Sequence, residues 1–372
     1  MTGPLTGVRV VELKGIGPAP FCGMMLADLG ADVVRVERPV SGAGPHAPAT
    51  DVLGRGRSSV ALDLKQPGAA DSVLALVERA DVLIEGFRPG VMERLGLGPE
   101  PCLARNPALV YGRMTGWGQD GPYARTAGHD INYIAVSGAL GAMGPADGPP
   151  ALPLNLLGDF GGGGMLLAVG VLAALLHSRV TGEGQVVDAA IVDGTATLSA
   201  LLHGLMAQGR WTAERGGNFL DGSAPYYTVY PCEDQLFVAV GALEDQFYAQ
   251  LLAGLGAGDD PVLTTDRTGR HNWPAIRDRL GGLFASRPRR EWLEVFAGSD
   301  ACVSPVLGLA DAPQDAHVGA RRTFVDVGGV PQPAPAPRFS RTPASTPRPA
   351  PSPGHDTATV LGGLASEPRR KG

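Results

Sequence analysis

The chain has 372 residues, of which 44% are hydrophobic and 18% are charged. This length exceeds what one hydrophobic core usually organises, and the composition excludes wholesale disorder, so we expect a folded protein of two structural units. The 31 basic and 37 acidic residues give a net charge of −6, which provides no global attraction to nucleic acid or to an anionic membrane.

The cysteines and the two ends of the chain point to the cytoplasm. The cysteines are far apart and form no CxxC pair, so neither a metal site nor a disulfide framework is indicated. The N-terminus lacks a basic stretch followed by an apolar one, and the last residues, 367–372, carry no peroxisomal or prenylation signal. We therefore expect a cytoplasmic protein with no bound metal and no membrane segment.

Strand-like and helical runs alternate through the first third of the chain. Residues 8–13 read as a strand, residues 21–29 as a helix and residues 32–37 as a second strand, which together predict a βαβ unit. Further strands are expected at 59–64, 81–85 and 108–114, and a helix at 68–79. This pattern predicts a mostly parallel sheet that is covered by helices on both faces.

The turn after the first strand begins like a dinucleotide-binding fingerprint. Gly15 and Gly17 fit that motif, but Pro20 stands where the third glycine belongs and Pro18 interrupts the turn. A strand-to-helix turn with proline in the first helical turn explains the residues better than NAD or FAD binding.

The middle of the chain predicts a second domain. A glycine-rich entry at 158–164 leads into a long apolar helix, and strands at 226–230 and 235–240 precede helices at 244–255 and 273–285. Nine prolines between Pro331 and Pro353 exclude a helix or a central strand there. The composition is compatible with an extended return segment and also with a disordered tail after about residue 330.

One pair of motifs combines a titratable imidazole, carboxylates and glycine-rich backbone. Gly128–Tyr133 contains His129, and Asp159 follows thirty positions later, just before four glycines. Taken alone, Asp159 reads as a helix N-cap and His129 as a structural histidine. Amides at the expected helix start after Asp159 are candidates for binding an anion or an enolate oxygen.

Several ordered motifs resemble family III CoA-transferases, and most closely the branch of that family that racemises 2-methylacyl-CoA thioesters. The resemblance runs from about Pro4 to Phe339. Its motifs include VRVVELKGIGPAPFCGMMLADLGADVVRVERP, LDLKQP, DVLIEGFRPGVMERLGLGP, GRMTGWGQDGP, AGHDINYIAVSGAL, PLNLLGDFGGGG and TGEGQVVDAAIVDGTA.

The resemblance implies an α/β fold with a doubly wound, Rossmann-like large domain, a small α+β domain and an interlocked homodimer. The large domain would comprise residues 1–190 and 325–372, and the small domain 220–310, joined by a linker at 191–219 and a return linker at 311–324. The proline-rich stretch would then be an ordered return path rather than a tail.

The resemblance also implies an enzyme of fatty-acid and lipid metabolism that interconverts (2R)- and (2S)-2-methylacyl-CoA by two-base proton transfer at C2. Asp159 matches an aspartate that racemases and transferases of the family share, whereas His129 matches a histidine that the transferases generally lack. Asp130 and Glu244 match further polar positions of the racemase site, and Glu244 would reach His129 of the other subunit.

The remaining matched positions would hold the CoA moiety, and no other cofactor is expected. They are Arg38, Leu62, Asp63, Leu64, Lys65, Gly86, Phe87, Arg88, Arg94, Gly128, Ile131, Asn132 and Tyr133. Two alternatives stay open. One is a CoA-transferase that moves CoA between carboxylic acids with Asp159 as nucleophile, and the other is a nucleotide-binding module without catalysis.

Overall fold

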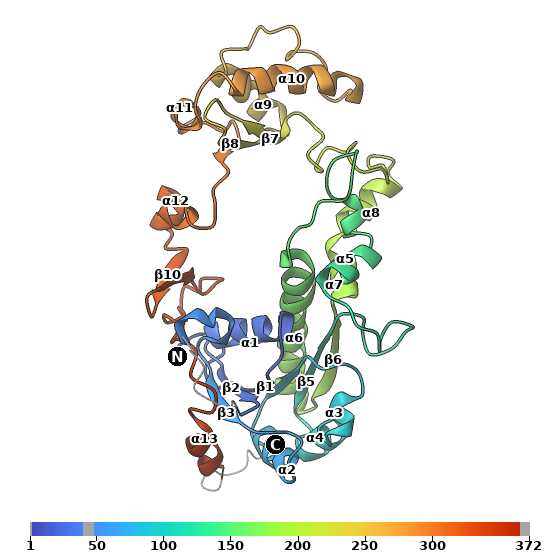
Figure 1. The fold of residues 1–372 in the computed structure, drawn as a ribbon, viewed down its shortest axis with the longest axis vertical. Helices are drawn as coiled ribbons and strands as arrows, with labels where there is room; N and C mark the ends of the chain where they lie inside the picture. The colour runs from blue at the N-terminus through green and yellow to red at the C-terminus, as the bar shows by residue number, and fades with distance from the viewer. Residues whose placement is uncertain (1, 40–47, 365–372) are drawn as a thin grey trace. The chain divides into compact units, whose positions relative to one another are not determined.

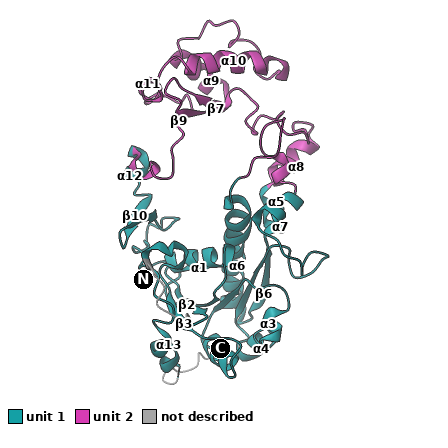
Figure 2. Ribbon diagram, viewed as in Figure 1, with its two compact units in different colours: residues 1–137, 153–198, 316–372 teal, residues 138–152, 199–315 magenta. Residues whose placement is uncertain are grey.

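The computed structural model describes residues 2–39 and 48–364. The chain forms two compact units: residues 1–137, 153–198 and 316–372 make unit 1, and residues 138–152 and 199–315 make unit 2 (Figure 2). The C-terminal residues 367–372, where no targeting signal was expected, lie outside the described residues. The domain limits expected at 190, 219, 310 and 324 stay a prediction, since compactness alone defines the two units.

Unit 1 is built on a parallel six-stranded sheet in the order β3-β2-β1-β4-β5-β6 (Figure 1). Its strands are β1 Arg9–Leu13, β2 Asp32–Glu37, β3 Ser58–Ala61, β4 Val82–Glu85, β5 Val110–Thr115 and β6 Gln185–Ala190. The strand order reverses between β1 and β4, so the carboxyl ends of these two strands flank a switch point, the usual ligand site of such sheets.

Helices cover both faces of this sheet because successive strand residues point to opposite sides. Val10 packs with α1 and α6 on one face, whereas Val11 packs with α2 and α4 on the other. The helices of unit 1 are α1 Pro18–Asp28, α2 Ala69–Val77, α3 Val91–Arg94, α4 Pro99–Arg105, α5 Asp130–Val136, the π-helix Leu156–Met165, α6 Leu166–Thr181, α7 Ile191–Leu198, α12 Ala316–Ala320 and α13 Thr357–Gly363.

The π-helix and α6 together form one long apolar helical run, Leu156–Thr181. By length and composition alone this run could cross a membrane. Its inner residues Leu167, Val171 and Ala174 pack in the core beneath β5 and β6. A helix that covers a sheet passes the same test of length and composition, so this run is weak evidence for a membrane span.

The proline-rich return segment belongs to unit 1. It begins with the antiparallel hairpin of β10 Phe324–Val327 and β11 Val330–Pro333. Arg55, buried at 2% exposure, pairs with Asp28 and donates to the carbonyl of Pro333 at 2.8 Å. Further along, the N–H of Ser59 donates to Asp356 at 2.8 Å. Because its described residues bond to the sheet domain in this way, the segment is an ordered return path and not a disordered tail.

Unit 2 contains a three-stranded antiparallel sheet in the order β7-β8-β9. The strands are β7 Tyr227–Pro231, β8 Phe237–Gly241 and β9 Val303–Pro305, and the helices are α8 Ala200–Ala207, α9 Asp245–Gly254, α10 Trp273–Phe284 and α11 Arg289–Val295. A core rich in aromatic side chains joins α9, α10 and α11 to the sheet. The strands and helices expected near 226–240, 244–255 and 273–285 are therefore present.

Candidate functional site

Two cavities lie along the carboxyl edge of the unit 1 sheet. The first, of about 410 Å³, is lined by the loops that follow β1, β4 and β5, by the start of α5 and by the π-helix. The second, of about 320 Å³, lies over the ends of β1, β2 and β3. Phe87, in the loop after β4, lines both cavities. The two cavities therefore adjoin at the switch point of the sheet.

His129 lies in the first cavity, immediately before the first residue of α5. Its backbone N–H donates to the side-chain oxygen of Asn132 at 3.0 Å. The hydroxyl of Tyr133 donates to the carbonyl of Gly128 at 2.5 Å. The first turn of α5 thus fixes the backbone on both sides of His129, while the His129 side chain itself is exposed.

The ring of Tyr133 fits against the cavity wall because two glycines leave room for it. A Cβ added at Gly116 would lie 1.9 Å from the Tyr133 ring, and one at Gly128 would lie 2.7 Å from it. Trp117 meets the same ring edge-on, with the centroids 4.7 Å apart. Burial raises the pKa of Tyr133, and the charge of Asp159 acts in the same direction.

Asp159 lines the same cavity from inside the π-helix. Its backbone N–H donates to Oδ1 of Asp130 at 2.6 Å, and its Oδ2 accepts a hydrogen bond from the amide of Asn155 at 3.3 Å. Burial raises the pKa of the Asp159 carboxyl, and the negative charge of Asp130 adds to that increase. The hydrogen bond from Asn155 and the charge of His129 act in the opposite direction.

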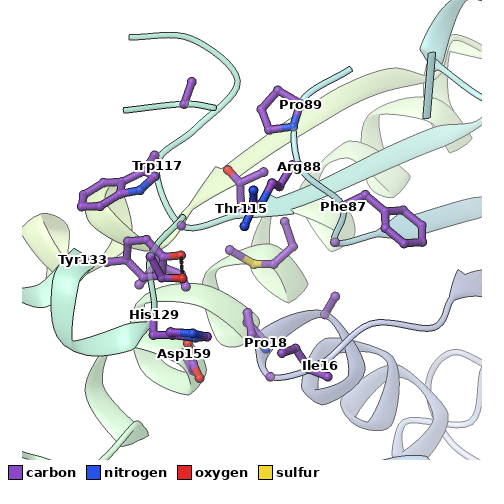
Figure 3. A pocket seen from close by; sticks show the side chains of 18 of the residues that line it. Ile16, Pro18, Phe87, Arg88, Pro89, Thr115, Trp117, His129, Tyr133 and Asp159 are labelled. Atoms are coloured by element: carbon purple, nitrogen blue, oxygen red, sulfur yellow. Dashed lines mark hydrogen bonds between the residues drawn. The ribbon is translucent and has the colours of Figure 1, made fainter. Parts of the chain in front are cut away.

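The two residues singled out by the sequence therefore meet in one cavity. They are thirty positions apart in the chain, yet both line the first cavity, where Figure 3 labels both side chains. Asp130 does not line this cavity, because its buried side chain reaches the backbone of Asp159 instead. Asp130 thus supports the position of Asp159 from outside the cavity.

The expected anion-binding amides after Asp159 are not available. Asp159 lies within the π-helix Leu156–Met165 and not before its start. In a π-helix each N–H donates to the carbonyl five residues earlier, as Phe160 does to Asn155 at 3.3 Å. The glycine amides at 161–164 are committed to the helix in the same way. The expectation failed because glycine-rich sequence does not reveal where a helix begins.

The second cavity brings together five of the residues matched to CoA binding. They are Arg38, Leu62, Asp63, Leu64 and Lys65, so the lining combines charged and apolar side chains. Hydrogen bonds from the Gln66 side chain and the Lys65 N–H lower the pKa of Asp63, and the charges of Arg38 and Lys65 lower it further. Gly86, Arg88 and Gly128 instead line the first cavity, and Phe87 lines both.

Besides Asp130, four predicted residues lie outside the linings of both cavities. Arg94 is exposed at the end of α3, and Ile131 and Asn132 are exposed in the first turn of α5. Glu244 belongs to unit 2, where it is exposed just before α9. Among the described residues no group of three His, Cys, Asp or Glu side chains could hold a metal ion.

Among the cavity residues that the sequence did not assign to the site are Asn155, Gly17 and Lys14. Asn155 contacts Asp159 from four positions earlier, a helical spacing that could have suggested it. Gly17 has a φ of 69° and lies so close to Asp159 that an added Cβ would be 3.2 Å from the carboxylate. Lys14 lines the second cavity with its partner Glu37. Nothing in the sequence near Lys14 indicated that pairing.

Comparison with known proteins agrees with the motifs. The chain matches CoA-transferase family III over residues 5–357. The mouse protein "Alpha-methylacyl-CoA racemase" is 46% identical over 96% of this chain and 92% of its own length, and the human protein of that name is 46% identical over 91% and 87%. "Acetyl-CoA:oxalate CoA-transferase" of Acetobacter aceti is 33% identical over 89% of this chain and 88% of its own.

The fold agrees as well. A crystal structure of a CAIB/BAIF family protein from Brucella suis matches with a TM-score of 0.84 and 28% identity, covering 98% of this chain and 100% of that one. The α/β fold class and the family expected from the sequence are confirmed. The chain belongs to CoA-transferase family III.

Proposed function

We propose that this protein is a racemase that interconverts (2R)- and (2S)-2-methylacyl-CoA thioesters. The observation that carries the proposal is that His129 and Asp159, far apart in the chain, line one cavity. The similarity to the mouse and human racemases, at 46% identity over most of the chain, supports it. No metal or cofactor besides the CoA of the substrate is needed for this reaction.

Racemisation requires one group to remove the C2 proton from one face and another group to return a proton to the opposite face. His129 and Asp159 would exchange these roles according to which epimer is bound. A general base works best when its pKa is near the working pH. The raised pKa of Asp159 brings a carboxyl group toward that range, because burial penalises its charged form.

Asp130 would act as a positioning residue and not as a third proton carrier. Its carboxylate accepts the N–H of Asp159 at 2.6 Å and is itself buried. Its negative charge also contributes to the raised pKa of Asp159. Asp130 would therefore set both the place and the basicity of the carboxylate that faces the substrate.

The second cavity would hold the adenosine end of CoA. The apolar side chains of its lining suit an adenine ring, and the charges of Arg38 and Lys65 suit phosphate. The thioester end would then pass Phe87 into the first cavity, where Arg88 and Tyr133 lie. Arg94, Ile131 and Asn132 would contribute only at the margin, because they lie outside both linings.

We further propose the interlocked homodimer that the family resemblance implies, with Glu244 reaching His129 of the other subunit. A carboxylate beside an imidazole fixes its tautomer and raises its basicity. Glu244→Gln would then change the pH–rate profile of racemisation. An unchanged profile would remove Glu244 from the site, and a monomer by light scattering would remove the dimer.

The decisive experiment incubates each epimer of a 2-methylacyl-CoA in deuterated buffer. Two-base transfer predicts racemisation accompanied by deuterium at C2 of both epimers, and racemisation without any exchange would refute it. Adding an acceptor carboxylic acid tests the transferase alternative. The 33% identity to an oxalate CoA-transferase is the observation that favours this alternative. Transfer of CoA to the acid, with a trapped Asp159 adduct and no racemisation, would favour that alternative.

A further inference from the structure

We infer that Lys14 binds the diphosphate of the CoA substrate, replacing the backbone amides that bind diphosphate in dinucleotide-binding sheets. This inference rests on the proposed function, because it presumes a CoA thioester in the two cavities. It adds a binding residue at the switch point, where the sequence motifs had indicated only a strand-to-helix turn.

Lys14 directly follows the carboxyl end of β1 and lines the second cavity. Ile16 and Gly17 of the same loop and the first two residues of α1 line the first cavity. A CoA molecule lying along both cavities would place its diphosphate between the adenosine and the pantetheine. Lys14 therefore lies in the wall of the second cavity, in a loop that continues into the first, and within reach of a diphosphate placed between them.

The start of α1 is poorly suited to bind phosphate itself. In a Rossmann sheet the helix after β1 presents free N–H groups to the diphosphate. Here α1 begins with Pro18 and contains Pro20, neither of which has an N–H. The N–H of Phe21 donates to Gly17 within the helix. In addition, the Asp159 carboxylate lies against Gly17, so the helix start already faces a negative group.

The side chain of Lys14 is held in place yet keeps donors to spare. Its ammonium contacts Glu37 at 2.5 Å, with 44% of the Lys14 side chain exposed and 1% of Glu37. An ammonium has three N–H donors, so one bond to Glu37 leaves two for phosphate oxygens. The fixed geometry means that little side-chain freedom is lost when the ligand binds.

Glu37 is an anchor that does not compete for the ligand. Its other oxygen accepts bonds from Arg35 at 3.2 Å and Ser59 at 2.5 Å. Burial alone would raise the pKa of Glu37, but the hydrogen bonds from Lys14 and Ser59 and the charge of Arg35 lower it overall. Glu37 therefore stays ionised and keeps the ammonium of Lys14 at the cavity wall.

The test measures binding of CoA, 3′-dephospho-CoA and pantetheine to the full-length protein by calorimetry. Lys14→Met should weaken binding of CoA and of 3′-dephospho-CoA by about tenfold or more, and leave pantetheine, which lacks the diphosphate, unchanged. Equal affinity of variant and parent for CoA would overturn the inference. So would an effect that vanishes with 3′-dephospho-CoA, because the contact would then be to the 3′-phosphate.

Two further variants test whether the lost affinity comes from the contact between Lys14 and the ligand. Lys14→Met leaves the buried Glu37 paired with Arg35. Adding Glu37→Gln removes the carboxylate charge as well, while Asp51 still pairs with Arg35. Lys14→Met and this double variant should both lose the affinity with thermal unfolding midpoints like that of the parent, so that a folding defect cannot imitate lost binding. Arg105→Met is the matched control, because the Arg105 side chain is 48% exposed and pairs at 2.6 Å with the Glu78 side chain, which is 9% exposed, but Arg105 lines neither cavity. A similar loss in Arg105→Met would overturn the inference.

The experiment also separates this inference from the proposed function. In one outcome the parent protein binds CoA and racemises a CoA thioester while Lys14→Met binds CoA equally well. That result would support the racemase function and refute only the role of Lys14. A parent protein that binds no CoA removes both.

Discussion

The two proposed bases are held in different ways. His129 has an exposed side chain at the start of α5, and its support comes from backbone hydrogen bonds on either side of it. Asp159 is half-buried in a π-helix, and side chains of Asp130 and Asn155 contact it directly. The fold thus positions the imidazole through the backbone, and it sets both the position of the carboxylate and how readily that carboxylate ionises.

This difference shows how two groups of unequal acidity can serve the two directions of one proton transfer. An ordinary aspartate is far more acidic than an imidazole and would give its proton away too readily to serve both directions. Burial and the charge of Asp130 raise the pKa of Asp159 and so bring the two groups closer in strength. The carboxylate needs this adjustment because its ordinary titration range lies far from neutral pH.

The largest effect is expected from removing either base. His129→Asn and Asp159→Asn should each reduce racemisation by about 10²–10⁴-fold, the usual contribution of a general acid or base. Each variant should still exchange the C2 proton of the one epimer whose proton faces the surviving base. Deuterium incorporation into each pure epimer, followed by mass spectrometry, measures this.

One result would contradict the assignment of His129 and Asp159 as the two bases. If both variants lose exchange from both epimers while their thermal unfolding midpoints match the parent protein, the two residues do not act on opposite faces. His129 and Asp159 would then not be two independent bases.

Asp130→Asn should have the next largest effect, about a tenfold lower rate. The asparagine oxygen can still accept the N–H of Asp159, but the negative charge is gone. Because that charge raises the pKa of Asp159, its removal lowers that pKa. In the direction where Asp159 takes the proton, the acidic limb of the kcat profile should therefore move to lower pH.

Asp130→Ala serves as the companion variant because it removes the acceptor as well as the charge. It should be slower than Asp130→Asn, and its acidic limb should also lie at lower pH than that of the parent. A limb that stays in place in both variants would show that Asp130 only packs against the π-helix.

Tyr133→Phe tests the support of His129 alone. The variant keeps the ring between Gly116 and Gly128 but loses the hydrogen bond to the Gly128 carbonyl. One lost hydrogen bond should slow proton transfer by about fivefold, and only on the face served by His129. Equal slowing of exchange for both epimers would contradict a role confined to that base.

Asn155→Ala should give the smallest change and one of opposite sign. The hydrogen bond from Asn155 lowers the pKa of Asp159, so its loss raises that pKa and moves the acidic limb to higher pH. The shift should be small because Asn155 is exposed to water. A shift in the same direction as Asp130→Asn would show that the Asn155 contact does not act through the pKa of Asp159.

Much of the sheet domain was predictable from sequence because its strands are short apolar runs separated by clear turns. The strands expected at 81–85 and 108–114 appear as β4 Val82–Glu85 and β5 Val110–Thr115. The edge strand β6 Gln185–Ala190 was missed, since only its last two residues are buried and its hydrophobic pattern is weak.

The candidate site was predictable in part. The resemblance to the family identified His129 and Asp159, and they do share a cavity. The contact from Asp130 to Asp159 was not foreseen, because it joins residues 29 positions apart and no local periodicity encodes it. The π-helix was missed for a related reason, since its five-residue bonding leaves no distinct pattern in glycine-rich sequence.

The buried Arg55 has a consequence for how the protein is made. Its guanidinium lies inside unit 1 and bonds to Pro333 and Gln332, nearly 280 positions later in the chain. On the ribosome, where the N-terminal part emerges first, this arginine has Asp28 as a partner but lacks Gln332 and Pro333 until the last tenth of the chain is being synthesised. The sheet domain therefore cannot reach its finished state during translation of its own N-terminal half.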